Sequence, residues 1–280
     1  MIANLRKMDI LLFKAIRRLY QENPLRHCFL FHNVVFETEL CEAVFHIRES
    51  NIFSYAMLYR GHLEETHLHL YGDLTEIEDQ VEYWLRRFRR VKVISYSEAA
   101  RRKVEAMLPK LGATYTKKRL LDYVTDEISF YERASINEAV RMSPTYSAYD
   151  VLDLYKSVGM ERVALEDVSR LLGSRRCYGY YDKQRKLIAM ACRYVALPDV
   201  WVVGEIVVRP GYEEAREPLE SVIYTAAKEG VAGGARVLLL IDEGNELLKD
   251  VAKFLGFREI GFRTRIDVRT PTSALLNRGS

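Results

Sequence analysis

Two apolar runs late in the chain predict buried strands. Trp201 to Val208 and Arg236 to Ile241 are rich in Val, Ile and Leu, which is typical of strands covered on both faces of a sheet. Apolar residues at helical spacing fill the interval from Glu213 to Lys228 and return from Gly244 to Leu255. Neighbouring strands joined through a helix run parallel, so this stretch predicts a β-α-β-α unit.

Turn-forming residues mark the ends of these elements. Arg209-Pro210-Gly211 follows the first strand, and a glycine-rich stretch at residues 230–234 predicts the end of the first helix. Ligands of such sheets bind beyond the carboxyl ends of parallel strands, where a helix N-terminus offers its N–H groups to anions. We therefore expect a ligand near Tyr212 and Glu213.

The first half of the chain has a similar pattern. A helix is predicted from Asp9 to Gln21, and it ends before Asn23-Pro24. Four strand-like segments that predict an antiparallel meander follow it: Cys28 to Phe31, Ala43 to Ile47, Ser54 to Tyr59 and His67 to Tyr71. Helices and strands then alternate: Glu76 to Phe88 (helix), Val91 to Ser95 (strand), Glu98 to Leu111 (helix) and Thr114 to Val124 (strand).

The second half of the chain predicts another copy of this series of strands and helices. Glu127 to Tyr131 predicts its first strand. Two helices and a hairpin then lead to the strand at Trp201: Ser143 to Val158, Glu166 to Leu172, Cys177 to Tyr181 and Leu187 to Val195. Both halves thus predict the order β-β-β-α-β-α-β.

This repetition defines the expected domains. The interval from Gly112 to Val124 has the same length as that from Gly256 to Val268, which aligns the two halves. We expect an α/β (α+β) fold with one lobe at residues 1–124, a second at 125–268, and a flexible tail at 269–280.

Motifs around the second lobe's parallel strands resemble a known family. Val208-x-Pro210-x-Tyr212 precedes the helix, and Asn245 is followed at a fixed distance by Phe254-Leu255-Gly256-Phe257. These residues resemble the core of the GNAT superfamily of acyl-CoA-dependent N-acyltransferases. The resemblance covers roughly Ile128 to Val268. It implies two tandem GNAT-like lobes, each a mixed, mostly antiparallel sheet flanked by helices.

The resemblance also implies chemistry, with acetyl-CoA or another acyl-CoA as donor and the primary amine of a small molecule or peptide as acceptor. Glu205 matches an often acidic position and is the candidate base, although it alternatively pairs with Arg193. The residues expected to contact the cofactor are Ile206, Val207, Val208, Tyr212, Arg216 and Asn245. Tyr146 and Tyr149 would line the acceptor pocket, or else pack on the sheet with their hydroxyls in water.

The coenzyme loop departs from the family pattern. The motif Q/R-x-x-G-x-G/A places its defined positions at Glu213, Arg216 and Pro218, with two further glutamates between them. Carboxylates repel a pyrophosphate and proline lacks an N–H to bind it. The family's general-acid tyrosine corresponds to Ala252. Two functions are therefore open: an N-acyltransferase, or a non-catalytic GNAT-like binding or scaffold protein that has lost its coenzyme loop.

Composition sets the broad class. The 280 residues suffice for two domains with ordinary cores, and 49% hydrophobic residues with a net charge of +3 are typical of a globular protein. No apolar run approaches the roughly 18 residues of a membrane span, and the amino terminus lacks the apolar segment of a signal peptide. We expect a cytoplasmic protein, and the abundance of Arg, Lys and Glu favours a thermophilic source.

Cysteines and histidines favour structural roles. The four cysteines, Cys28, Cys41, Cys177 and Cys192, are scattered, as thiols of a reducing compartment are, although Cys177 and Cys192 are also placed to pair across adjacent strands. His67 and His69 share one face of a strand, but no third ligand accompanies them at a recognisable spacing. We expect no metal site.

The densest basic cluster runs from Arg86 to Lys92 and continues at Arg101-Arg102-Lys103. Such a cluster tracks phosphates in nucleic-acid binders, but cations also stabilise a helix C-terminus. The small net charge favours the second explanation, so we expect no nucleic-acid partner.

Overall fold

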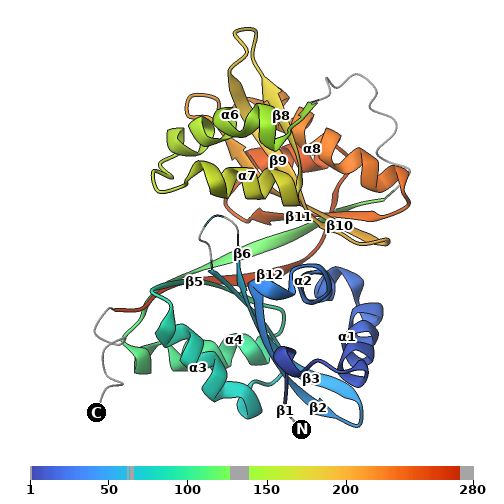
Figure 1. The fold of residues 1–280 in the computed structure, drawn as a ribbon, viewed down its shortest axis with the longest axis vertical. Coiled ribbons are helices and arrows are strands. Elements are labelled where there is room, and N and C mark those ends of the chain that lie inside the picture. Colours follow the sequence, from blue (N-terminus) through green and yellow to red (C-terminus); the bar gives the residue numbers. More distant parts are fainter. Residues whose placement is uncertain (1, 62, 64–65, 127–138, 272–280) are drawn as a thin grey trace. The chain divides into compact units, whose positions relative to one another are not determined.

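The computed structural model describes residues 2–61, 63, 66–126 and 139–271, and Figure 1 traces its elements along the chain. The first half contains β1 (Ile2–Asn4), α1 (Ile10–Glu22), α2 (Pro24–Phe36), β2 (Cys41–Arg48), β3 (Asn51–Arg60), β4 (Thr66–Tyr71), α3 (Glu78–Arg87), β5 (Arg90–Ser95), α4 (Glu98–Met107) and β6 (Thr114–Thr125). The second half contains β7 (Val140–Arg141), α6 (Pro144–Ser157), α7 (Leu165–Ser174), β8 (Arg176–Tyr181), β9 (Leu187–Ala196), β10 (Val200–Val208), α8 (Arg216–Ala232), β11 (Arg236–Asp242), α9 (Glu246–Phe254) and β12 (Arg258–Arg269).

The two halves repeat one order of elements. From α1 and again from α6, two helices are followed by three strands, a helix, a strand, a helix and a strand. Gly112 and Gly256, aligned by the sequence, both adopt left-handed backbone with φ of 61° and 90° just before the last strand of each half. The predicted tandem organisation is confirmed.

Two strands run from one compact unit into the other. Unit 1 consists of the residues up to Leu120 together with those from Phe262 onward, and unit 2 consists of Leu121–Gly261. The structure therefore differs from the expected lobes at 1–124 and 125–268, because the second half of β12 belongs to unit 1. Consecutive elements are usually neighbours in space, and β12 departs from that tendency.

Unit 1 has the strand order β1-β2-β3-β4-β5-β12. β4 and β5 are parallel, and β12 pairs antiparallel with β5 from Thr264 opposite Ser95 to Arg269 opposite Arg90. α1 and α2 pack on one face of this sheet, and α3 and α4 pack on the other (Figure 1). Ile266 of β12 is fully buried in the core under α3 and α4, so the second half of the last strand is an integral part of unit 1.

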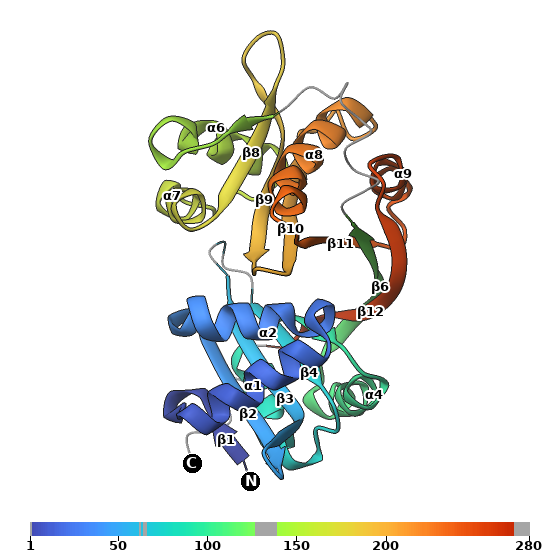
Figure 2. The same cartoon turned by 90° about the vertical axis from the view of Figure 1, so that its right-hand side faces the viewer.

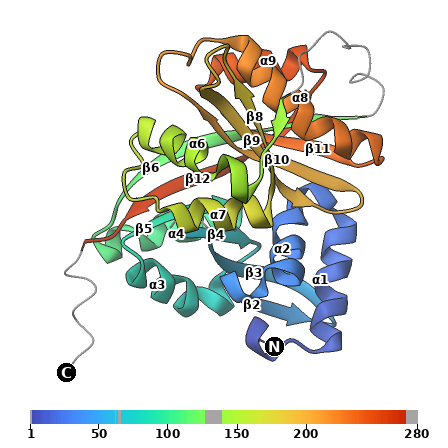
Figure 3. The same cartoon turned by 45° about the horizontal axis from the view of Figure 1, so that its top comes forward.

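Unit 2 has the strand order β6-β11-β10-β9-β8-β7. β10 and β11 are parallel, as predicted, whereas β7, β8, β9 and β10 pair antiparallel with one another in turn. This confirms a mixed, mostly antiparallel sheet flanked by helices. Val222 and Ile223 of α8 pack against one face, where they join Val203 and Leu239 in a buried cluster. α6 and α7 cover the opposite face (Figures 2 and 3).

The predicted strand from Cys28 to Phe31 is wrong, because these residues lie in α2. Asn23 caps this helix by accepting a hydrogen bond from the N–H of Arg26 at 3.1 Å, and Pro24 occupies its first turn, where the missing N–H costs nothing. The same Asn23-Pro24 pair that ends α1 therefore starts α2. A short apolar run fits either period, which explains the error.

The predicted end of the helix in the glycine-rich stretch 230–234 is confirmed, because α8 ends at Ala232 with Gly233 as its C-cap, four residues beyond Lys228. A Cβ atom at Gly230 would lie 2.6 Å from the ring of Trp201, so this glycine allows α8 to pack closely on β10. The predicted strand from Glu127 to Tyr131 and the tail residues 272–280 lie outside the described residues. Within the described ranges, no helix is long and apolar enough to span a membrane.

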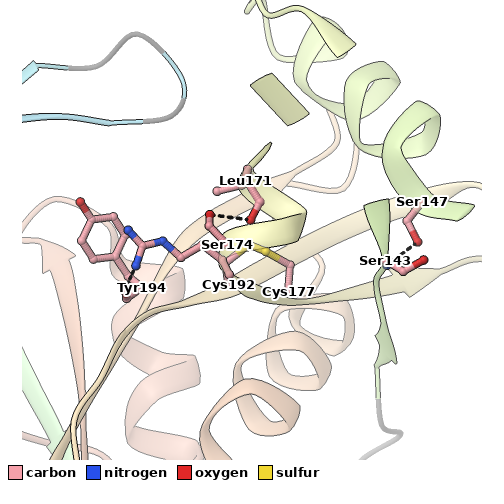
Figure 4. The surroundings of a disulfide bond; sticks show 8 residues. Ser143, Ser147, Leu171, Ser174, Cys177, Cys192 and Tyr194 are labelled. Carbon is pink, nitrogen blue, oxygen red and sulfur yellow. Dashed lines mark hydrogen bonds between the residues drawn. A yellow bond between two sulfur atoms is a disulfide. The ribbon is translucent and has the colours of Figure 1, made fainter. Parts of the chain in front are cut away.

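Cys177 on β8 and Cys192 on β9 form a disulfide, drawn with its surroundings in Figure 4. The two residues are buried and directly opposite each other in the strand register. The expectation of scattered core thiols is wrong for this pair, and the alternative pairing is confirmed. The bond joins β9, which is the neighbour of β10 in the sheet, to β8, which is the next strand after β9.

Candidate active site

β10 carries a bulge where the resemblance places the candidate base. β10 and β9 are in register at Gly204 opposite Cys192, and again at Val207 opposite Met190. Two residues of β10, Glu205 and Ile206, therefore face a single residue of β9. Glu205 adopts φ of 48°, a left-handed conformation that is uncommon for a residue with a side chain. Bulges and strained residues cluster at functional sites because they redirect side chains.

The parallel ladder between β10 and β11 stops at the same point. Val200 to Val203 pair with Arg236 to Leu239, whereas β10 continues to Val208 and β11 to Asp242. A bulge bends its strand and increases its twist, which accounts for the end of regular pairing at this point. Ile206, Val207 and Val208 are half-buried. An extended ligand could pair with the strand edges beyond this point.

The loop that follows β10 is partly filled by one of its own carboxylates. The N–H of Gly211 donates to the carboxylate of Glu213 at 2.6 Å, and the N–H of Ala215 donates to the Tyr212 carbonyl at 3.0 Å. α8 then begins at Arg216 without a side-chain cap and carries Glu217 in its first turn. The loop thus provides an anion with fewer N–H groups than a bare helix N-terminus would.

The expected cofactor contacts outside β10 have partners within the protein. The Arg216 guanidinium lies 2.9 Å from the Glu220 carboxylate and 5.1 Å from the centre of the Phe254 ring. Asn245 caps α9 by accepting a hydrogen bond from the Leu248 N–H at 3.0 Å. Tyr212 is 38% exposed. These residues therefore also stabilise the ends of α8 and α9, the two helices beside the strand ends.

Helix α6 displays the two tyrosines predicted for the acceptor. Tyr146 and Tyr149 are 89% and 73% exposed, whereas Tyr155, further along the helix, is buried. Their alternative role, packing on the sheet, therefore does not hold for the two exposed residues.

Sequence reasoning missed two carboxylates that tether α6. Asp150 accepts a hydrogen bond from the Tyr181 hydroxyl at 2.9 Å, and Asp153 accepts one from Arg209 at 2.6 Å. Burial and the hydrogen bond to Asp150 raise the pKa of Tyr181 to about 12. Two acids one turn apart, together with an arginine directly after a buried strand, were the available signal.

The position of the family's general acid is apolar in this protein. Ala252 is fully buried in the core of unit 2, among Leu248, Val251 and Leu255. A tyrosine hydroxyl does reach the start of α8, because Tyr180 donates to Glu217 at 3.0 Å. Burial and this carboxylate raise the pKa of Tyr180 above its ordinary value.

The histidine pair and the basic cluster have structural partners. His69 is buried and lies 2.6 Å from the Tyr96 hydroxyl through its Nδ1 atom. Among the described residues, no three His, Cys, Asp or Glu side chains gather as a metal site would require. In the basic cluster, ion pairs join Arg86 to Glu82 at 2.6 Å and Arg101 to Glu105 at 2.7 Å. Carboxylates thus offset much of this charge.

Solved structures share this fold across almost the whole chain. A Drosophila protein superposes with a TM-score of 0.72 at 13% identity and covers 95% of this chain and 97% of its own. A tandem GNAT protein from the clavulanic acid biosynthesis pathway gives 0.59 at 12% identity, over 96% and 98% of the two chains. A GCN5-related N-acetyltransferase-like protein from Streptococcus suis gives 0.59 at 12% identity, over 91% and 99%.

No family model matches the sequence, and a search of curated proteins also finds no match. The structural likeness identifies the class: the protein has the GNAT fold, present as two lobes in tandem. At 12–13% identity this likeness concerns the fold, and any activity must be argued from the site.

Proposed function

We propose that the protein is an N-acyltransferase that moves an acyl group, most simply acetyl, from acyl-CoA to a primary amine, with unit 2 as the catalytic lobe. The observation that carries the proposal is the end of the β10–β11 ladder at Val203 and Leu239, beside the bulge at Glu205. A bulge at the end of a parallel pair is what an extended thioester-bearing arm needs in order to pair with strand edges.

In the proposed reaction, Glu205 accepts a proton from the attacking amine. The amine nitrogen forms a bond to the thioester carbonyl carbon while a backbone N–H near Val207 stabilises the oxyanion. The carbon–sulfur bond then breaks, and the thiolate takes a proton from water because Ala252 supplies none. The donor arm would run along Ile206 to Val208 toward Tyr212, Arg216 and Asn245, and the acceptor would approach from Tyr146 and Tyr149.

A second candidate, a non-catalytic binding or scaffold protein, is favoured by a different observation. The Glu213 carboxylate takes the Gly211 N–H in the loop where the coenzyme's pyrophosphate would bind. Glu217 and the N–H-deficient Pro218 stand in the first turn of α8. A binding or scaffold protein with this fold would tolerate these residues, whereas a coenzyme site must bind the pyrophosphate despite their negative charge and the missing N–H.

Calorimetric titration with acetyl-CoA separates the two candidates. We expect binding in the micromolar range that is weakened in Arg216→Glu, because the reversed charge faces the pyrophosphate. Arg170→Glu is a matched control, since Arg170 lies on α7 and pairs with Asp167 much as Arg216 pairs with Glu220. Absence of binding at millimolar acetyl-CoA would overturn the enzyme and leave the scaffold.

A further inference from the structure

We propose that Arg209 and Asp153 form a positioning pair, which holds helix α6 against the carboxyl end of β10 and thereby couples the acceptor side of the site to the donor side. The inference deepens the proposed function and rests on it for its kinetic consequence. Arg209 directly follows the last residue of β10 and is only 7% exposed, and Asp153 lies on α6.

Backbone and side chain together anchor Arg209 to β9. Its N–H donates to the Ile188 carbonyl at 2.8 Å, and its Nε atom donates to the Leu187 carbonyl at 2.9 Å. Its own carbonyl accepts a hydrogen bond from the Tyr212 N–H at 3.1 Å. Arg209 therefore fixes both the end of the bulged strand and the start of the loop that leads to α8.

The remaining contact of Arg209 reaches α6. Its Nη2 atom lies 2.6 Å from the Asp153 carboxylate, and the two side chains are 8% and 66% exposed. A buried guanidinium requires an acceptor for its outer N–H groups, and its planar fork allows one group to bond β9 while another bonds α6. A charged hydrogen bond thus joins α6 to the end of β10, in addition to the apolar packing of buried α6 residues such as Val151 and Leu154.

A second tether on the same helix provides a matched comparison. Asp150 lies one turn before Asp153 and accepts from the hydroxyl of Tyr181 at 2.9 Å. Tyr181 ends β8, which is two strands away from β10 in the sheet order. Both carboxylates hold α6 on the sheet, but only that of Asp153 is joined to the strand that carries Glu205.

Steady-state kinetics of Asp153→Asn and Asp150→Asn test the inference. In Asp153→Asn we expect kcat to fall about tenfold, since small misplacements of reacting groups are costly, while the Kd of acetyl-CoA stays unchanged. Asp153→Glu should recover part of the loss. Asp150→Asn should keep kcat within about twofold at a similar loss of thermal stability. Equal effects of the two Asn variants on kcat would overturn the positioning role.

A measurement that does not depend on catalytic activity tests the positioning pair independently of the proposed function. Deuterium exchange at the backbone amides of Val207, Val208 and Arg209 should accelerate in Asp153→Asn and stay as in wild type in Asp150→Asn. Faster exchange in Asp153→Asn with no acetyl-CoA binding in wild type would support the pair and overturn the enzyme. Unchanged exchange would overturn the pair whatever the activity.

Discussion

In unit 1 the two central parallel strands stay together to their ends. β4 and β5 are in register as far as Leu70 opposite Ser95, and the N–H of Tyr96 then donates to the Leu70 carbonyl at 2.9 Å. The N–H of Gly72 donates to the Ser97 hydroxyl at 3.0 Å, just before α4 begins. These bonds continue the strand pairing into the following turns, so the strand edges bond to each other.

In unit 2 the corresponding strands separate early, after Val203 and Leu239, where β10 bulges at Glu205. The order of elements is the same in both units, so that order alone does not make a site. Under the proposed function, the local departure from regular pairing leaves strand edges for a ligand. We therefore treat unit 1 as a structural partner and unit 2 as the candidate catalytic lobe.

The largest expected effect concerns Glu205, which has no counterpart in the closed ladder of unit 1. Glu205→Gln should lower kcat by about 10²- to 10⁴-fold while the Kd of acetyl-CoA is unchanged, because only the proton acceptor is removed. Glu205→Gly should lose the same activity yet gain thermal stability, because glycine adopts φ of 48° without strain. Turnover at the wild-type rate in Glu205→Gln would remove it from the mechanism.

The next effect tests which strand completes which unit. Ile266, late in the chain, is buried in the core of unit 1, and Leu121, from the first half, is buried in that of unit 2. We expect Ile266→Ala and Leu121→Ala each to cost about 2–5 kcal/mol in the free energy of unfolding. Deuterium exchange should report the loss in unit 1 for Ile266→Ala and in unit 2 for Leu121→Ala. The opposite result would refute the assignment of the second half of β12 to unit 1 and of the end of β6 to unit 2.

Acid should weaken unit 1 before unit 2, because every histidine of the chain lies in the first seventy residues. Burial, with Arg26 and Arg263 nearby, lowers the pKa of His27 to about 3, and burial lowers that of His69 as well. Below pH 6.5 the unfolded chain gains protons that the folded unit does not, so stability falls as pH drops toward 3. The slope is roughly 1.4 kcal/mol per pH unit for each such histidine.

Urea unfolding of wild type and His27→Phe at pH 7 and pH 5, followed by exchange in each unit, measures this effect. The phenyl ring keeps the aromatic contacts with Tyr55 and Tyr71 but binds no proton. We expect a smaller pH dependence in the variant. Equal acid sensitivity of wild type and variant would assign the effect to His69 or to carboxylates instead.

The smallest effect concerns the loop before α8. Glu213→Ala should raise the affinity for acetyl-CoA about two- to fivefold, because it releases the Gly211 N–H and removes a charge near the helix N-terminus. Glu214→Ala removes the same charge without that hydrogen bond and should give a smaller gain. Equal gains in calorimetry would show that charge alone matters, and no gain would show that the loop does not meet the pyrophosphate.

The sequence allowed much of unit 2 to be predicted, because its strands and helices are long and strongly periodic. β10, β11 and α9 lie within two residues of their predicted bounds. The helix at Pro24 was missed because Cys28 to Phe31 is too short to separate a period of 2 from one of 3.6. The pairing of β12 with β5 was missed because pairing partners are far apart in the chain.

The sequence proposes the residues of the candidate site but does not encode their geometry. The resemblance pointed to Glu205, yet its left-handed backbone depends on the register of β9 with β10, which no local pattern encodes. The bond from Gly211 to Glu213 and the pair of Arg209 with Asp153 depend on loop and helix placement. The sequence shows which segments are rich in charged residues, whereas the tertiary structure determines which of these residues form ion pairs.

The contribution of β12 to unit 1 has a consequence for synthesis of the protein on the ribosome. β5 receives its antiparallel neighbour from residues 264–269, which emerge long after the rest of unit 1. Until then β5 lacks its β12 neighbour and Ile266 is missing from the core. Domains usually fold one after another from the amino terminus. Here the first unit reaches its native state only after the second has been translated, so nascent chains stalled between the units should be substrates for chaperones.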